Sequence, residues 1–267
     1  MPARPPEPVA GSYEIDTGTA VLERRHDDTG LWTLDVNGVP SSSLRPDEPH
    51  VLEFEYLQQM ADVLDVLRPE PAPLRVLHLG GAGCALPWAL AVRRPRSEQV
   101  VLELDARLTV LVRQWFALPR SPALRLQAAE AGAGLAGRRD ASADAVVRDV
   151  FAGDTTPEHL RTAAFLAQVR RVLVPGGVYL ANVADGPPLR DLRAEVATAQ
   201  QAFAHVAVLA ETAVLRGRRH ANAVLVACDD PMDPAALHRA ARGRGVSSTA
   251  LVGERLRRFV AGAAPLG

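Results

Sequence analysis

The alternation of short apolar segments with amphipathic segments constrains the fold of this chain more than any other feature of its sequence. Apolar runs follow one another through the middle of the chain, and stretches with helical spacing separate most of them. The runs are residues 75–79, 99–103, 124–128, 144–149 and 177–183, and the helical stretches are residues 84–93, 106–117 and 157–173. Continuous apolar strands alternating with helices are typical of a parallel sheet covered on both faces. The sequence therefore predicts an α/β fold with a doubly wound, Rossmann-like sheet.

The residues before this pattern predict a small N-terminal β unit. Residues 12–43 have a β-type pattern, and Asn37-Gly38 is a strong hairpin signal because both residues accept positive φ angles. We expect a helix to follow at residues 49–66. The proline-rich residues 68–73 are the expected domain boundary.

The residues after the last core run predict a further helix at 188–203, two runs that form an antiparallel hairpin at the sheet edge (205–210 and 222–228), and a short helix at 234–243. Within the core, Thr156 is the expected N-cap of helix 157–173. The expected organisation is a disordered lead-in, an N-terminal unit of hairpin and helix, a Rossmann-like nucleoside-binding domain and a C-terminal tail, at residues 1–10, 11–67, 74–245 and 246–267.

The composition excludes several classes of enzyme. The chain of 267 residues contains no lysine, so all 30 of its basic residues are arginines. Walker-type nucleotide hydrolases, pyridoxal phosphate enzymes and protein kinases each need a lysine for their chemistry. The formal net charge of -1 gives no field that would steer the chain to nucleic acid or to anionic lipid. We therefore expect no nucleic-acid partner and no membrane partner.

The cysteines and the apolar segments bear on location. Cys84 and Cys228 are the only cysteines and lie far apart, so we expect neither a disulfide framework nor a metal site. The proline-rich N-terminus does not resemble a signal peptide, and no run of 18 apolar residues occurs. We expect a cytoplasmic protein.

A glycine-rich turn follows the first core strand at Gly80-Gly81-Ala82-Gly83, and Glu103-Leu104-Asp105 ends the second. Such a turn lets the backbone approach a ligand, and an acid about 20 residues further on can accept hydrogen bonds from ribose hydroxyls. The third glycine of a dinucleotide motif is replaced by Leu86. This pattern favours a nucleoside ligand of the S-adenosylmethionine type, with no metal.

Further polar residues end the other strands. Glu130, before Ala131, can accept from an adenine amino group, and Asp149 ends a strand so apolar that burying its charge indicates a task. His78 in the first strand is a candidate for ligand contact or a core histidine, and His159 is a weaker candidate base. Asn182 and Asp185 are interpreted as turn formers.

The order of these residues resembles the spermidine synthase family, the polyamine aminopropyltransferases, whose catalytic domain has the class I methyltransferase-like fold. The matching segments are Val36-Asn37-Gly38, Asp47-Glu48, the glycine turn, Glu103-Leu104-Asp105, Glu130-Ala131, Asp149 and Val174-Pro175-Gly176-Gly177. The resemblance implies that Glu103 and Glu130 hold the ribose and adenine of decarboxylated S-adenosylmethionine. It also implies that Asp149 is the general base, that the protein acts in polyamine biosynthesis, and that subunits pair through the N-terminal β unit as a homodimer.

The chain departs from the family in the part of the site that holds the polyamine. Gly83 stands where the family has an Asp in its glycine turn, and Ala152 stands where a second acid is expected after Asp149. Val51-Leu52 occupy the place of a Tyr-His pair, and the expected Gln falls among residues 41–43. Asp154, in a loop with Gly153, is a candidate replacement for the second acid.

These observations predict a transferase that moves an aminopropyl or methyl group from decarboxylated S-adenosylmethionine or S-adenosylmethionine to a small-molecule acceptor. A dication without carboxylates at its ends would be buried unpaired, so the acceptor is not expected to be putrescine. The sequence leaves one alternative open, a non-catalytic homologue that binds a nucleoside or serves as a dimerising module.

Overall fold

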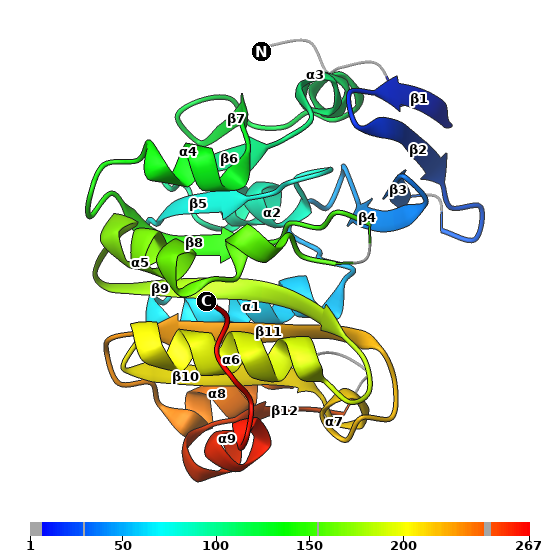
Figure 1. The fold of residues 1–267 in the computed structure, drawn as a ribbon. Helices are drawn as coiled ribbons and strands as arrows, with labels where there is room; N and C mark the ends of the chain where they lie inside the picture. Colours follow the sequence, from blue (N-terminus) through cyan, green and yellow to red (C-terminus); the bar gives the residue numbers. More distant parts are fainter. Residues whose placement is uncertain (1–6, 29, 154, 243–246) are drawn as a thin grey trace. The chain divides into compact units, whose positions relative to one another are not determined.

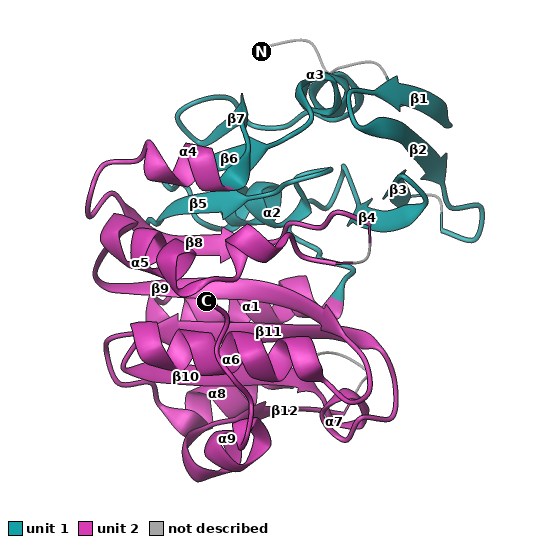
Figure 2. Ribbon diagram, viewed as in Figure 1, with its two compact units in different colours: residues 1–54, 70–131 teal, residues 55–69, 132–267 magenta. Residues whose placement is uncertain are grey.

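The computed structural model describes residues 7–28, 30–153, 155–242 and 247–267. The chain forms two compact units (Figure 2). The first contains residues 1–54 and 70–131, and the second contains residues 55–69 and 132–267. Each unit is α/β in character, and we describe them separately.

The first unit begins with an antiparallel meander of four strands, β1 (Gly11–Ile15), β2 (Gly18–Arg24), β3 (Trp32–Val36) and β4 (Val39–Leu44). The predicted turn at Asn37-Gly38 joins β3 to β4, with φ angles of 52° and 78° at the two residues. The Asn37 side chain also accepts a hydrogen bond from the Thr19 amide. The hairpin prediction is thus confirmed.

The same unit contains three parallel strands in the order β5 (Arg75–Leu79), β6 (Glu98–Glu103) and β7 (Leu124–Ala128). Helices α2 (Ala85–Arg93) and α3 (Ala106–Trp115) connect them. These bounds agree with the predicted strand–helix alternation to within two residues. Because all three strands run in one direction, their carboxyl ends lie at one edge.

The second unit contains five strands in the order β12-β10-β11-β9-β8. Strand β8 (Ala143–Arg148) pairs in parallel with β9 (Leu173–Asp185), and the remaining pairings are antiparallel. As predicted, β10 (His205–Glu211) and β11 (Ala221–Cys228) pair with each other. They do not end the order, because β12 (Ser248–Leu251) pairs with the other side of β10.

Helices cover both faces of these five strands (Figure 1). Helices α5 (Ala163–Val172) and α6 (Arg190–Ala202) lie on one face, and α1 (Glu55–Leu67) and α8 (Pro234–Ala241) lie on the other. The 3₁₀ turn at Glu158–Leu160, α4 (Ala131–Ala136), α7 (Thr212–Leu215) and α9 (Gly253–Val260) complete the chain.

Two sequence predictions about helix bounds are wrong. The helix expected at 49–66 begins only at Glu55, because the residues before it form hydrogen-bonded turns such as that from the Val51 amide to the Glu48 carbonyl. The helix expected at 157–173 begins at Ala163, since Glu158–Leu160 form a separate 3₁₀ turn and Thr162 caps the helix. Within the expected C-terminal tail at 246–267, β12 pairs with β10 and α9 packs on α6.

The expected domain boundary at residues 68–73 stays a prediction. Helix α1, assigned to the N-terminal unit from sequence, belongs to the second compact unit, and the Rossmann-like domain expected at 74–245 contributes to both units. Among the residues that the structure describes, no helix is long and apolar enough to span a membrane.

We predict that Thr162→Ala destabilises the protein. Thr162 is the N-cap of α5, and its side chain accepts from the Phe165 amide at 3.2 Å. Removing an N-cap oxygen leaves that amide unpaired and typically costs about 1 kcal/mol. Denaturant unfolding followed by circular dichroism should show this loss. Thr155→Ala, at an exposed loop position, is the matched control, and equal stability of both variants would contradict the assigned helix start.

Candidate active site

The glycine turn after β5 has a backbone that few side chains tolerate. Gly80, Ala82 and Cys84 have φ angles of 82°, 40° and 63°, in the left-handed region. At Gly81 a Cβ atom would lie 2.3 Å from Cγ1 of Val101 in the neighbouring strand, so only glycine fits there. The turn is therefore a strained, closely packed element at the carboxyl end of β5. Strain of this kind is common at functional sites.

Glu103, at the carboxyl end of β6, turns its carboxylate to this glycine turn. Its Oε2 accepts hydrogen bonds from the amides of Gly81 and Ala82 at 3.1 and 3.0 Å, and its Oε1 accepts from the Asp105 amide at 3.2 Å. Successive amides in such a turn form an anion-binding nest. The predicted ribose acceptor and the predicted glycine turn thus lie together, and the Glu103 side chain is half-buried.

Gly83 lies against strand β4 with no room for a side chain. Its amide donates to Ser42 Oγ at 2.9 Å, and an added Cβ would lie 2.8 Å from both Leu44 Cδ1 and Ser42 Cβ. The acid expected from the family is therefore not simply missing at this position. The side chains of Ser42 and Leu44 in β4 leave no room for a larger residue.

Asp105 was predicted to bind the cofactor, and in the structure both of its carboxylate oxygens have other partners. It is buried, and its Oδ1 caps α3 by accepting from the Leu108 amide at 2.7 Å. Its Oδ2 accepts from both the amide and the hydroxyl of Thr17 at 2.7 and 2.9 Å. Burial alone raises the pKa of Asp105, but the hydrogen bonds from Leu108 and Thr17 outweigh it and lower the pKa. Both oxygens are occupied in holding α3 to the N-terminal sheet.

The other predicted residues of the first unit differ in exposure. Glu130 is half-exposed between β7 and α4, and Ala131 is buried at the start of that helix. His78 is 1% exposed inside β5, where its Nε2 pairs with Gln99 Oε1 at 2.8 Å. Burial lowers the pKa of His78 to about 4, so the ring is neutral near pH 7. His78 is thus placed as a core histidine.

Asp149, directly after β8, is held by two side chains of the second unit. Tyr56 OH donates to Oδ2 at 2.9 Å, and Asn182 Nδ2 donates to Oδ1 at 2.8 Å. Burial raises the pKa of Asp149, although the hydrogen bonds from Asn182 and Tyr56 oppose this shift. Burial and the negative charge of Asp149 also raise the pKa of Tyr56 well above its usual value, so its hydroxyl stays protonated. A carboxylate fixed at both oxygens with a raised pKa is suited to accept a proton.

Sequence reasoning missed both partners of Asp149. The family tyrosine was sought at Val51-Leu52 by fixed spacing, whereas the tyrosine that bonds Asp149 is Tyr56 in α1. Asn182 was interpreted as a turn former, but it is 2% exposed within β9. The available signals were a polar residue inside an otherwise apolar strand and a tyrosine on the buried face of a helix.

The other residues of the second unit considered from sequence have structural contacts, are exposed, or lie outside the residues that the structure describes. Asp185 accepts from the amides of Gly186 and Leu192, as a turn former does. His159 is exposed in the 3₁₀ turn. Ala152 is exposed, and its amide donates to the Thr155 carbonyl. Asp154, the candidate second acid, lies outside the described residues.

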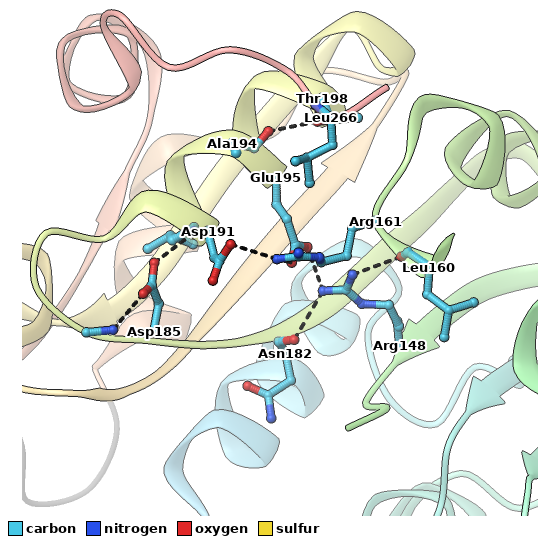
Figure 3. A network of polar contacts seen from close by, with 12 residues as sticks. Arg148, Leu160, Arg161, Asn182, Asp185, Asp191, Ala194, Glu195, Thr198 and Leu266 are labelled. Carbon is cyan, nitrogen blue, oxygen red and sulfur yellow. Dashed lines mark hydrogen bonds and ion pairs between the residues drawn. The ribbon is translucent and has the colours of Figure 1, made fainter. Parts of the chain in front are cut away.

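A buried ion pair lies next to Asp149 (Figure 3). Arg148 is fully buried, and its Nη2 lies 2.6 Å from Glu195 Oε2 on α6. The same guanidinium donates to the backbone carbonyls of Leu160 and Asn182 at 3.0 and 3.2 Å. One arginine thus connects β8 with β9, α6 and the loop that follows Asp149.

Comparison with known proteins assigns the chain to a family. No family model matches the chain. A crystal structure of a probable spermidine synthase from Corynebacterium glutamicum ATCC 13032 is 35% identical in sequence, with a TM-score of 0.90, and the match covers 97% of this chain and 96% of that one. A structure of human methyltransferase-like protein 13 in complex with SAH shares the fold, with a TM-score of 0.54 and 22% identity over 77% of this chain and 89% of that one.

A curated relative agrees with this assignment over a shorter stretch. The polyamine aminopropyltransferase of Vibrio vulnificus (strain CMCP6) is 31% identical over 123 residues, which are 45% of this chain and 41% of the relative. The match thus spans less than half of the relative's length. The predicted fold class, α/β and Rossmann-like with a small N-terminal β unit, is confirmed by these similarities together with the observed strands. The chain belongs to the spermidine synthase family, the polyamine aminopropyltransferases.

Proposed function

We propose that this protein is a transferase that uses S-adenosylmethionine or its decarboxylated form to alkylate an acceptor other than putrescine, with Asp149 as the base. The observation that carries the proposal is the Asp149 carboxylate, which is held by Tyr56 and Asn182 and has a pKa raised by burial. Membership of the family and the contacts of the glycine turn support it.

The adenosyl group of the donor is assigned to the first unit. Glu103 would exchange its hydrogen bonds with the Gly81 and Ala82 amides for bonds from the ribose hydroxyls. Glu130 would accept from the adenine amino group. Support comes from the human methyltransferase-like structure, which holds SAH in the same fold.

The proposed reaction is a direct displacement. A nitrogen lone pair of the acceptor attacks a carbon bonded to the sulfonium, the C–S bond breaks, and its electrons leave with the neutral thioether. The proton lost from the nitrogen goes to Asp149. Tyr56 and Asn182 orient the two carboxylate oxygens, and orientation of this kind supplies much of the rate enhancement in such displacements.

The acceptor is proposed to be less cationic than putrescine. Gly83 has no side chain and no space for one, and Ala152 is also without charge. Neither position supplies a carboxylate to a diamine, and an ammonium group buried without a partner costs several kcal/mol. An acceptor that is neutral away from the reacting nitrogen avoids this cost.

We expect Glu103→Gln to weaken binding of methylthioadenosine by about 10-fold to 100-fold, since a hydrogen bond to a charged acceptor contributes roughly 1.5–3 kcal/mol. Isothermal titration calorimetry measures this change. Glu98→Gln, an exposed position at the start of the same strand, is the control and should bind normally. Absence of heat with methylthioadenosine, S-adenosylmethionine and decarboxylated S-adenosylmethionine in the unaltered protein would overturn the donor assignment.

We expect Asp149→Asn to lower turnover by about 10²-fold to 10⁴-fold without changing donor affinity, because the amide cannot accept the proton. In the unaltered protein, turnover should fall as the pH drops through the raised pKa of Asp149, at a higher pH than for an ordinary aspartate. Transfer from both donors to a panel of amines, measured by mass spectrometry, tests this, with exposed Asp140→Asn as the control. Undetectable turnover of the unaltered protein with every amine would favour the non-catalytic alternative.

Gly83→Asp, which introduces the acid found in the family, should lower the free energy of unfolding by about 1–3 kcal/mol through overpacking against Leu44 and Ser42. It should not create putrescine transfer. The control is Gly137→Asp, at an exposed position where a Cβ has ordinary contacts. A Gly83→Asp variant of normal stability that transfers to putrescine would contradict the steric explanation.

A further inference from the structure

Arg148 and Glu195 are an uncommon pair, because both charges are withdrawn from water. Their side chains are 0% and 5% exposed, and the N–O distance is 2.6 Å. Burial raises the pKa of Glu195, and the positive charge of Arg148 opposes this shift. Desolvating two such groups often costs as much as their mutual attraction returns.

The pair is also incompletely satisfied. Arg148 Nε and Glu195 Oε1 have no hydrogen-bond partner among the residues that the structure describes, and Arg161 Nη1 lies 4.0 Å from Glu195 Oε1. A buried polar atom without a partner lowers stability. Stabilisation of the fold therefore does not explain why the pair is present. Its location beside Asp149 suggests a different role.

The contacts of Arg148 lead to Asp149 by two routes. Along the backbone, the two residues are adjacent. Across the sheet, Arg148 Nη2 binds the carbonyl of Asn182, while the Asn182 side chain donates to Asp149 (Figure 3 shows the carbonyl turned to Arg148 and the side-chain amide turned away). Arg148 Nη1 also fixes the carbonyl of Leu160, at the end of the loop that follows Asp149.

We propose that Arg148 is a positioning residue for Asp149, and that Glu195 holds Arg148 in place. In this arrangement, Arg148 fixes the strand residue that orients the carboxylate and supplies the positive charge that keeps the carboxylate ionised inside the protein. The inference rests on the proposed role of Asp149 as the base, and extends it to two residues that touch no substrate.

The charged and polar groups of the second unit that act on Asp149 determine in which direction Arg148 and Glu195 shift its pKa. Tyr56 from α1 and Asn182 from β9 donate hydrogen bonds to it, and Arg148 from β8 is the cation that favours its charged form. Glu195 from α6 and Tyr179 from β9 act electrostatically on Arg148, and both raise its pKa. The charge of Arg161 lowers the pKa of Glu195, and the charge of Asp191 raises it. Removing Arg148 should therefore raise the pKa of Asp149, and removing only the charge of Glu195 should lower it.

The test is a titration of the Asp149 carboxyl carbon by ¹³C NMR in the full-length protein labelled at aspartate, with the signal assigned by Asp149→Asn. The double variant Arg148→Met/Glu195→Leu should shift the titration upward, because it removes the cation that favours the charged carboxylate. Glu195→Gln, which keeps an acceptor for Arg148, should shift it downward. A purely structural pair would change the melting temperature and leave both titrations in place.

Asp191→Asn is the matched control, because Asp191 is an acid on the same helix that pairs with Arg161 rather than Arg148. It should leave the Asp149 titration within a few tenths of a unit. Should the double variant fail to fold, the isosteric Glu195→Gln decides alone, and an unchanged or upward shift there overturns the proposal. The titration needs neither donor nor acceptor, so its failure is distinguishable from failure of the proposed transferase activity.

Discussion

The desolvation of two adjacent charged residues at the end of β8 is the constraint on which the second unit depends. Every residue of β8 is buried, and Arg148 and Asp149 follow one another where the strand ends. Neither charge could remain there without specific partners. The partners come from α1, β9 and α6, so the packing of three separate elements is tied to this one dipeptide.

In the first unit, by contrast, backbone groups rather than side chains supply most of the polarity around the glycine turn. The amides of Gly81 and Ala82 face the Glu103 carboxylate, and the Gly83 amide is paired with Ser42. This turn offers hydrogen-bond donors and one acid, with no second carboxylate. That polarity suits an adenosyl group and does not suit a second ammonium group, which is why the proposed acceptor differs from a diamine.

The sequence was informative where local chemistry decides the structure. Asn37-Gly38 specifies its turn through the φ angles that both residues accept, and the apolar runs predicted β5 to β9 because continuous burial needs continuous apolar residues. The position of Glu103 beside the glycine turn could be predicted from its spacing after the glycines. The sequence could not show that Asp105 caps a helix, since capping and ligand binding both favour an acid at a strand end.

Other features depend on contacts between residues far apart in the chain, which no local pattern reveals. Tyr56 donates to Asp149 across 93 positions, and Arg148 binds the Leu160 carbonyl before the start of α5. Strand β12 has only four residues and exists because β10 offers an unpaired edge. In each case the deciding partner is a buried group, so local propensity was overruled by tertiary pairing.

Burial shifts the pKa of Asp149 in one direction, and its hydrogen bonds and the charge of Arg148 shift it in the other. Only together do they suit the proposed role as a base. Burial alone raises its pKa and so favours the protonated carboxyl, which cannot act as a base. A fully solvated aspartate would be ionised but a weak proton acceptor. Hydrogen bonds from Tyr56 and Asn182, together with the charge of Arg148, favour the ionised form and oppose burial. In the proposed arrangement, Glu195 partly neutralises Arg148, so the buried pair sets the strength of this opposition. The proton affinity of Asp149 is therefore a property of the packing of α1, β9 and α6 around β8.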